Sequence, residues 1–342
     1  MADQVLDQIV DALRNYGRGY FPGHPGHSGL TAVRVVGHTP KPDHYTYEIV
    51  MDFADGSERV SAKVYRTSKC GVQAAHDLAK HEFHNLNLVH QLGAHRKLPG
   101  VPRPLGDFTG NGAVVSTKIN GLPLQSLIMK AALLPDFGNH GLLQRAARQT
   151  GEWLYDFHKA TSQMPAPLDT KTVFGELEKL CVQAKREGLP EDFTESILDY
   201  ARTSLSRVSR PVASSAVLND FVPLNIMVTG DGVGFCEFAQ LSETGTSLND
   251  AAMFLAAVEA LEKYPFCDRA MTTLVQDAFL DAYSVCVQEL QLLTVLKLKV
   301  LLQMFTKGRA VKESAERKRV MWANVMKRFI QQAAERSMAP AA

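Results

Sequence analysis

Three oxygen-bearing side chains, Asp220, Asn225 and Glu237, lie within the single segment 218–238 of the chain. Asp220 and Asn225 share one short loop. Phosphoryl transfer uses such a trio: an Asp accepts the proton of the attacking hydroxyl, while an Asn and a second carboxylate hold the magnesium ions that bridge the phosphates. For this segment alone, the alternative is a strand–turn–strand whose polar side chains are only solvated.

The residues around this trio are typical of strands. Two apolar runs, Ile226–Val228 and Val233–Phe238, flank the sequence Thr-Gly-Asp-Gly, which predicts a β-hairpin. Glu237 comes near the far end of the second run, so the hairpin should return it towards the preceding loop. A further strand, Ser214–Leu218, is expected to lead into that loop.

The same segment resembles the catalytic segment of the aminoglycoside phosphotransferase and choline kinase families. It reads Asp220-Phe221-x-Pro223-x-Asn225-Ile226-x-Val228, followed after a turn by Glu237-Phe238. The usual wording in those families is H-G-D-x-x-x-x-N, followed by a strand that ends in D-F or D-x-D. Three positions depart from it: Leu218 stands where His is usual, Asn219 where Gly is usual, and Glu237 where Asp is usual.

The resemblance implies a protein-kinase-like fold, with ATP and Mg²⁺ as cofactors. It implies that Asp220 positions and deprotonates the attacking hydroxyl, and that Asn225 and Glu237 hold magnesium. The family also has a strand lysine, a helix glutamate and a hinge before this segment, so the rest of the chain is searched for these in that order.

The composition excludes several other classes of protein. The chain has 342 residues, 45% hydrophobic and 21% charged, which is ordinary for a globular protein with a sizeable core. A net charge of +1 gives no general attraction to nucleic acid or acidic membranes. The five cysteines form no CxxC pair, which argues against a zinc ribbon or a disulfide framework. No signal peptide or membrane span is recognisable, so we expect a cytoplasmic protein.

The first part of the chain predicts a sheet. After a short amphipathic helix at 3–15 and a Gly/Pro/His loop at 17–29, alternating apolar residues predict strands at 33–36, 45–53 and 59–65. In the loop, His24 and His27 could bind a metal, but no further ligand pair supports this and a plain surface loop is favoured.

On the third strand Val60, Ala62 and Val64 should face one way, and Ser61, Lys63 and Tyr65 the other. Alone, a mid-strand lysine indicates an edge or solvent position. In context, Val60-Ser61-Ala62-Lys63 resembles the V-A-I-K strand of kinases, whose lysine neutralises nucleotide phosphates.

A helix predicted at 72–92 carries Glu82 on an apolar stripe formed by Leu78, Ala79, Leu86 and Val89. A buried carboxylate needs a partner, and Lys63 is the natural candidate, giving the Lys–Glu pair that positions phosphates. The neighbouring His81-Glu82-Phe83-His84 is not HExxH, so a zinc protease is set aside.

A Pro-rich connection at 98–104 then leads to two short strands predicted around the turn 110–112. The second strand, ending at Ile119, runs into Asn120-Gly121-Leu122-Pro123-Leu124, which is similar to the hinge of the family. The resemblance implies that the backbone of 116–119 binds the adenine edge. The candidate nucleotide-binding positions there are Ser116, Lys118 and Ile119.

The rest of the chain predicts helices at about 142–158, 172–186, 191–208, 251–263, 268–304 and 313–336. The first ends at His158, for which a structural role is favoured over a catalytic one. Asp250 matches the family aspartate that holds the catalytic loop, although N-capping of its helix is the simpler role. The basic run 307–328 could meet an anionic substrate, but a solvated helix face is favoured.

Together these parts predict an α+β, two-lobed protein-kinase-like fold. A five-strand N-lobe at 1–118 precedes a helical C-lobe at 119–342, with nucleotide between the lobes. The leading function is ATP-dependent phosphorylation of a hydroxyl on a small molecule, with the 125–140 insertion and the C-terminal helices shaping the acceptor pocket. A protein acceptor is disfavoured because no A-P-E motif follows Glu237.

Three departures support a second hypothesis, a kinase-fold binding protein with weak or no turnover. The turn at 37–43 has one glycine and two prolines, which lack N–H donors for phosphates. Glu237 is one methylene longer than Asp, and Leu218 loses the hydrogen bonds of a His. The sequence names neither the acceptor, although the near-neutral charge argues against a strongly cationic one, nor the oligomeric state.

Overall fold

The computed structural model describes residues 2–21, 29–96, 98–134, 139–264, 266–307, 320–322 and 325–326. The chain forms two compact units: a sheet unit, Met1–Gly121 with Met227–Leu241, and a helical unit, Leu122–Ile226 with Ser242–Ala342. The sequence put a boundary at residue 118, close to where the chain first leaves the sheet unit. It did not foresee that 227–241 returns to that unit.

The sheet unit is built on a four-stranded antiparallel sheet. Its strands, in spatial order, are β1 (Leu30–Pro40), β2 (His44–Phe53), β3 (Gly56–Tyr65) and β4 (Ala113–Thr117). The expected fifth strand is wrong, because the segment before the turn contributes only a single bridge, Pro104 to Ser116. On this segment the N–H of Arg103 bonds the hydroxyl of Thr117 at 2.8 Å and not its carbonyl, so the ladder does not continue there.

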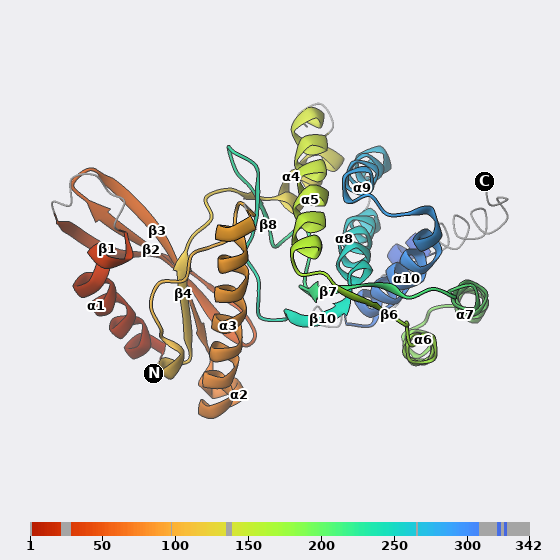
Figure 1. Cartoon of the computed structure of the whole chain (residues 1–342), viewed down its shortest axis with the longest axis horizontal. Helices are drawn as coiled ribbons and strands as arrows, with labels where there is room; N and C mark the ends of the chain where they lie inside the picture. The colour runs from red at the N-terminus through yellow and green to blue at the C-terminus, as the bar shows by residue number, and fades with distance from the viewer. Residues whose placement is uncertain are drawn as a thin grey trace. The chain divides into compact units, whose positions relative to one another are not determined.

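Helices cover both faces of this sheet (Figure 1). Helix α1 (Ala2–Tyr20) packs on the face that carries Ala62 and Val64 of β3, and α3 (Val72–Arg96) lies against the opposite face. A four-residue helix, α2 (Thr67–Cys70), connects β3 to α3. The predicted alternation along β3 is confirmed, so Lys63 and Tyr65 point towards α3.

One face of the sheet and α1 enclose the apolar core of this unit. Its buried members include Ile9, Leu13, Tyr47, Ile49, Met51, Val60, Ala62, Val64, Leu105, Ala113 and Val115. On α3, Ala79, Leu86 and Val89 are buried as the stripe predicted, but Leu78 is 38% exposed, so its assignment to the stripe is wrong.

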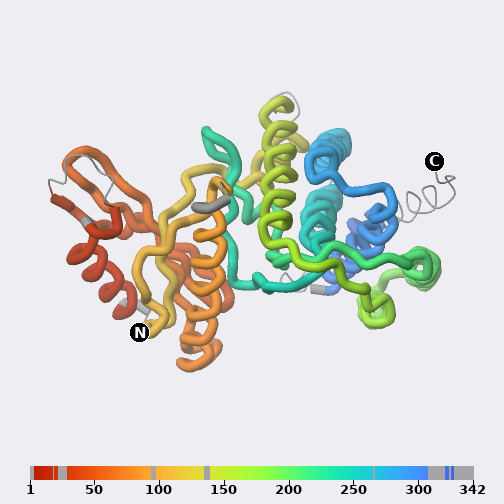
Figure 2. The backbone as a smooth tube through the Cα atoms, in the orientation of Figure 1, coloured from red at the N-terminus to blue at the C-terminus, as the bar shows by residue number. Residues whose placement is uncertain are grey.

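The returning segment packs along the 98–121 connection (Figure 2). It holds the predicted hairpin of β8 (Ile226–Val228) and β9 (Val233–Phe235), with Thr229 N–H bonded to the carbonyl of Gly232 across the turn. The second strand ends at Phe235 and not at Phe238. Phe235 N–H bonds the carbonyl of Gly100, and the Cα of Gly234 lies where a Cβ on Gly100 would clash.

The helical unit contains seven α-helices and four short strands among its described residues. The helices are α4 (Leu124–Leu133), α5 (His140–Ala160), α6 (Thr170–Arg186), α7 (Glu191–Ser206), α8 (Leu248–Ala260), α9 (Arg269–Tyr283) and α10 (Leu290–Lys307). The strands are β5 (Leu122–Pro123), β6 (Gln163–Ala166), β7 (Val212–Val217) and β10 (Ser242–Thr246), the last three forming a sheet in the order β10-β7-β6. Short 3-10 helices lie at Thr109–Asn111 in the sheet unit and at Leu261–Lys263 and Val287–Glu289 in this one.

A continuous row of aromatic rings forms the centre of this unit. Trp153 and Phe157 of α5 are stacked at 5.7 Å, and Trp153 also stacks on Phe221 at 6.0 Å. Phe221 in turn contacts Phe254 of α8, which stacks on Phe279 of α9 at 4.2 Å. Phe221 directly follows Asp220, so the packing of these rings fixes the loop that carries Asp220.

The C-terminal part differs from the helices predicted for it or lies outside the described residues. The single helix expected at 268–304 is wrong: α9 ends before Ser284, whose φ of 58° is left-handed, and α10 starts six residues later at Leu290. The helix expected at 313–336 and the basic run 307–328 lie almost entirely outside the described residues, as do His24 and His27. The 125–140 insertion contains α4, and its residues 135–138 also lie outside the described part.

The α+β class predicted from the sequence is confirmed by the sheet of one unit and the helices of the other. None of the helices in the described ranges has the length and apolarity needed to cross a membrane.

Two glycines inside helices give a matched test of the packing. A Cβ on Gly151 of α5 would lie 2.4 Å from the carbonyl oxygen of Phe279 and 3.0 Å from Cβ of Ala282, both on α9. A Cβ on Gly175 of α6 would meet nothing within 4 Å. Gly151→Ala should therefore lower the stability by about 1–3 kcal/mol, because α5 and α9 must separate.

Gly175→Ala, the control, should raise the stability by up to about 1 kcal/mol, because alanine favours the helix. Thermal unfolding followed by circular dichroism measures both variants. A Tm of the Gly151 variant equal to or above that of the unmodified chain would contradict the close α5–α9 contact.

Candidate active site

The sheet unit brings together three of the residues singled out from the sequence. Lys63 Nζ of β3 lies 3.0 Å from Glu82 Oε1 of α3 and 2.9 Å from Glu237 Oε1, which follows β9. The three side chains are 12%, 7% and 22% exposed. A lysine this deeply buried has to be paired, and here it is held by two carboxylates from distant parts of the chain.

The electrostatics of the cluster keep Lys63 charged. Burial by itself would lower the pKa of Lys63, but the carboxylates of Glu82 and Glu237 outweigh burial and raise it. Burial raises the pKa of Glu82, while Lys63 and the hydroxyl of Tyr65 act against that rise. Two donors therefore support the charged form of a carboxylate that is almost fully removed from water.

The position of Glu237 is fixed by its neighbours on the same segment. Its Oε1 also accepts the N–H of Ala239 at 3.2 Å, while Oε2 accepts no hydrogen bond from a described residue. Asn85 of α3 donates to the carbonyls of Phe238 and Leu241 at 2.9 and 3.4 Å, which ties the segment to the helix that carries Glu82. Sequence reasoning missed Asn85, although a polar residue three positions after Glu82 lies on the same helix face.

The helical unit brings together Asp220 and Asn225. The side-chain nitrogen of Asn225 donates to Asp220 Oδ2 at 2.9 Å and to the Asp220 carbonyl at 3.0 Å. Two backbone bonds, Val222 N–H to Asp220 and Asn225 N–H to Val222, make the loop a compact turn. These two hydrogen bonds assign the amide nitrogen of Asn225 to the side that faces Asp220, and the amide oxygen therefore points away from Asp220.

Asp250 of α8 holds the start of this loop. Its carboxylate is fully buried and accepts the N–H groups of Leu218 and Asn219, each at 2.8 Å. Asp250 Oδ2 also lies 3.1 Å from His158 Nε2, and His158 Nδ1 lies 2.9 Å from the hydroxyl of Tyr283. N-capping by Asp250 is wrong, because its oxygens bind the loop backbone and not the helix. His158 has the structural position expected for it.

Two of the departures from the family wording have a local explanation. Asn219 has a φ of 58°, in the left-handed region that glycine adopts without steric cost and that asparagine tolerates better than most other residues. Leu218 is fully buried, so an apolar side chain fills the place below the loop where a histidine would have made hydrogen bonds.

The predicted hinge residues lie at the end of β4 and just beyond it. Ser116 pairs with Ser61 inside the sheet, and the N–H of Lys118 is bonded to the carbonyl of Arg59 at 2.8 Å. The ammonium of Lys118 pairs with Glu48. Ile119 makes no backbone hydrogen bond to a described residue. Of the three candidates, only Ile119 has no backbone hydrogen bond to a described residue.

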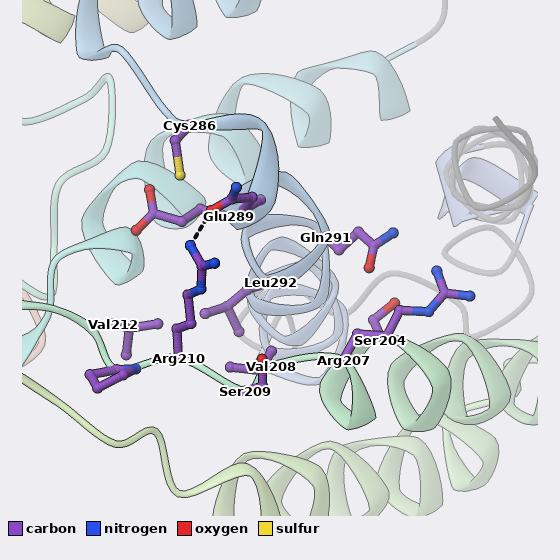
Figure 3. Close-up of a pocket in the computed structure, with 12 residues that line it drawn as sticks. Ser204, Arg207, Val208, Ser209, Arg210, Val212, Cys286, Glu289, Gln291 and Leu292 are labelled. Atoms are coloured by element: carbon purple, nitrogen blue, oxygen red, sulfur yellow. Dashed lines mark hydrogen bonds between the residues drawn. The ribbon is translucent and has the colours of Figure 1, made fainter. Parts of the chain in front are cut away.

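A cavity of about 350 Å³ in the helical unit is lined by none of these residues (Figure 3). It lies between the end of α7, the strand β7 and the start of α10. Arg210 reaches towards the Val287–Glu289 turn, with Nη1 3.5 Å from Gln288 Oε1, whereas Arg207 points away on the far side of Leu292. The two guanidinium groups therefore do not converge on one ligand.

Within the described ranges, no group of three or more His, Cys, Asp and Glu side chains could hold a metal ion. Hard cations such as Mg²⁺ prefer oxygen ligands, and the carboxylate of Glu237 is one such group in the sheet unit.

Comparison with known proteins gave matches to solved structures only. No protein-family model matches the chain. No curated protein sequence matches it either.

Several solved small-molecule kinases have a similar structure. A thermostable mutant of the aminoglycoside phosphotransferase APH(4)-Ia, in its apo form, has a TM-score of 0.53 at 12% identity, with 95% of this chain and 100% of that chain covered. A putative fructosamine-3-kinase from Thermobifida fusca has a TM-score of 0.51 at 15% identity, with 94% and 99% covered. The amicoumacin kinase hAmiN, in complex with AMP-PNP and Ca²⁺, has a TM-score of 0.50 at 14% identity, with 86% and 88% covered.

These similarities extend over nearly the whole length of each protein, and they confirm the protein-kinase-like fold expected from the sequence. At 12–15% identity they establish the fold, whereas the roles of individual residues have to be argued from the site itself.

The role of Asp250 can be tested by Asp250→Asn. An amide has only one acceptor oxygen, so at least one of the N–H groups of Leu218 and Asn219 loses its partner in a buried place. We expect a loss of about 2–4 kcal/mol in the free energy of unfolding by urea. Asp156→Asn, at an exposed position of α5, is the control and should change it by less than about 0.5 kcal/mol. Equal stability of the two variants would contradict the anchoring role.

Proposed function

We propose that this chain is a phosphotransferase that moves the γ-phosphate of ATP to a hydroxyl group of a small molecule. The observation that carries the proposal is the buried ammonium of Lys63 between Glu82 and Glu237. These carboxylates come from positions 19 and 174 residues away in the sequence. A chain has little structural reason to bury three charges in this way, because an apolar cluster would be at least as stable.

In this proposal Lys63 contacts the α- and β-phosphates of ATP, and Glu82 orients it. Asp220 accepts the proton of the acceptor hydroxyl as that oxygen attacks the γ-phosphorus. The hydrogen bond from Asn225 holds the Asp220 carboxylate in one orientation, while Asp250 holds the backbone of the loop beneath it. The phosphoryl group leaves ADP and forms a phosphate ester with the acceptor.

Asn225 and Glu237 fit the role of magnesium ligands. Each side chain carries an oxygen of the kind that Mg²⁺ prefers, an amide oxygen in Asn225 and a carboxylate in Glu237. When bound, Mg²⁺ would neutralise the charge of the phosphate oxygens.

For the adenine edge we propose the backbone of Ile119. Thr117 N–H is bonded to the carbonyl of Arg103 and Lys118 N–H to that of Arg59, so neither is available to a nucleotide. Ile119 comes next in the chain and its N–H and C=O groups are uncommitted among the described residues. Ser116 and the side chain of Lys118 then support the end of β4 and do not touch the base.

The acceptor is proposed to be a hydroxyl-bearing small molecule bound by the helical unit. Proteins of similar fold phosphorylate different small molecules, as the names aminoglycoside phosphotransferase, fructosamine-3-kinase and amicoumacin kinase show. The net charge of +1 argues against a strongly cationic acceptor.

A second candidate is a nucleotide- or ligand-binding protein of the same fold without turnover. The observation that favours it is the tip between β1 and β2, where Pro40 and Pro42 flank Lys41. The N–H of Lys41 is bonded to the carbonyl of His44, so this tip offers few backbone donors to phosphates. Nucleotide binding with no transfer to any acceptor would favour this candidate.

The first test is thermal unfolding of the purified chain with ATP and magnesium, with magnesium alone and with GTP and magnesium. Binding at 100 times the dissociation constant stabilises by about 2.7 kcal/mol, so a rise in Tm of at least about 3 °C is expected with ATP and magnesium. Lys63→Met should abolish this rise. Arg59→Met, which removes an exposed cation from the same strand, should keep it.

Asp220→Asn separates binding from chemistry. The variant should retain the nucleotide-dependent rise in Tm, but phosphate transfer, followed as ADP release in an acceptor screen, should fall about 10²–10⁴-fold. Full turnover by this variant would contradict the assignment of Asp220, and no response of the unmodified chain to any nucleotide would contradict the proposed function.

A further inference from the structure

The cluster around Lys63 contains a fourth side chain for which no role has been assigned. Tyr65 follows Lys63 by two residues on β3, so both side chains lie on the face towards α3. The Tyr65 hydroxyl donates to Glu82 Oε2 at 2.6 Å, while Glu82 Oε1 accepts from Lys63 at 3.0 Å. The two oxygens of Glu82 are thus held by two donors from a single strand.

Tyr65 also contacts the lysine itself. Lys63 Nζ lies 5.5 Å from the centre of the Tyr65 ring, within the range of a cation–π interaction. Tyr65 therefore touches both members of the ion pair, through its hydroxyl and through its ring.

The surroundings of Tyr65 restrict the movement of its side chain. It is 4% exposed, its backbone N–H is bonded to the carbonyl of Gly112 at 2.9 Å, and the ring of His44 meets its own ring edge-on at 5.9 Å. Burial and the charge of Glu82 raise the pKa of the phenol, so the hydroxyl keeps its proton and remains a donor.

Glu82 needs this second donor. Its side chain is 7% exposed, and a carboxylate in that position with one oxygen unsatisfied loses more free energy than an ordinary hydrogen bond contributes. Without the hydroxyl of Tyr65, Glu82 would have to turn or take up a proton, and either change weakens its hold on Lys63.

We infer that Tyr65 is a positioning residue: its hydroxyl and ring hold the Lys63–Glu82 pair in the geometry that binds the nucleotide phosphates. This inference rests on the proposed function for its kinetic consequence. Its structural part, the hold on the ion pair, stands apart from catalysis. Tyr65 itself touches no phosphate.

The test compares Tyr65→Phe with Tyr45→Phe. Tyr45 lies on β2 opposite Val64, next to the His44–Tyr65 pair, and its hydroxyl bonds neither Lys63 nor Glu82, so the control removes the same atom without touching the ion pair. Crystal structures of both variants without nucleotide should show the Lys63–Glu82 distance lengthened beyond about 4 Å in the Tyr65 variant only. An unchanged distance overturns the inference, whether or not the chain has kinase activity.

The kinetic consequence is a rise in KM for ATP with little change in kcat. We expect about a tenfold higher KM for Tyr65→Phe, the size of one hydrogen bond to a charged group, and an unchanged KM for Tyr45→Phe. Tyr65→Leu, which also removes the ring beside Lys63, should raise KM further. Equal KM values for the two phenylalanine variants overturn the inference.

A double-mutant cycle shows whether Tyr65 acts through Glu82. In a Glu82→Ala background, Tyr65→Phe should have almost no further effect on KM, because the side chain that it positions is gone. A full tenfold effect in that background would mean that Tyr65 acts by another route and overturns the inference. If Lys63→Met leaves nucleotide binding intact, the proposed function fails, and the crystal structures alone decide the role of Tyr65.

Discussion

The sheet unit depends on one buried ammonium group. Lys63 leaves water only because Glu82 and Glu237 meet it there, and each carboxylate reaches it from a different segment. This requirement fixes the face of β3 that turns towards α3, the rotation of α3 about its axis, and the return of 227–241 to the sheet. Asn85, on the same face of α3 as Glu82, secures that return through the carbonyls of Phe238 and Leu241.

A second buried charge organises the helical unit in the same way. The carboxylate of Asp250 accepts the backbone N–H groups of Leu218 and Asn219, and these two hydrogen bonds hold the loop before Asp220. Phe221 then fixes the other side of Asp220 by stacking on Trp153. The position of Asp220 is consequently fixed by the carboxylate of Asp250 and by the ring of Phe221.

The departures from the family wording have different consequences for function. Asn219 is compatible with the left-handed backbone that the loop needs, and buried Leu218 packs where a histidine would bond. Glu237 retains a charge that meets Lys63, although its side chain is one methylene longer than that of Asp. At the tip between β1 and β2, Pro40 and Pro42 have no N–H group, and the N–H of Lys41 between them is bonded to the carbonyl of His44.

The sequence determined the parts whose signal is local. These are the alternation along β3 that turns Lys63 and Ala62 to opposite faces of the sheet, the helix that carries Glu82, and the spacing of Asp220 and Asn225 in one turn. Only the tertiary structure decided the parts that depend on distant segments. Three features involve partners far along the chain. They are the absence of the fifth strand, the bond of Phe235 at the end of β9 to Gly100, and the contact of Asp250 with a loop thirty-odd residues away. Tyr65 belongs to both groups, since its direction followed from alternation, whereas its bond to Glu82 required the packing of α3 on the sheet.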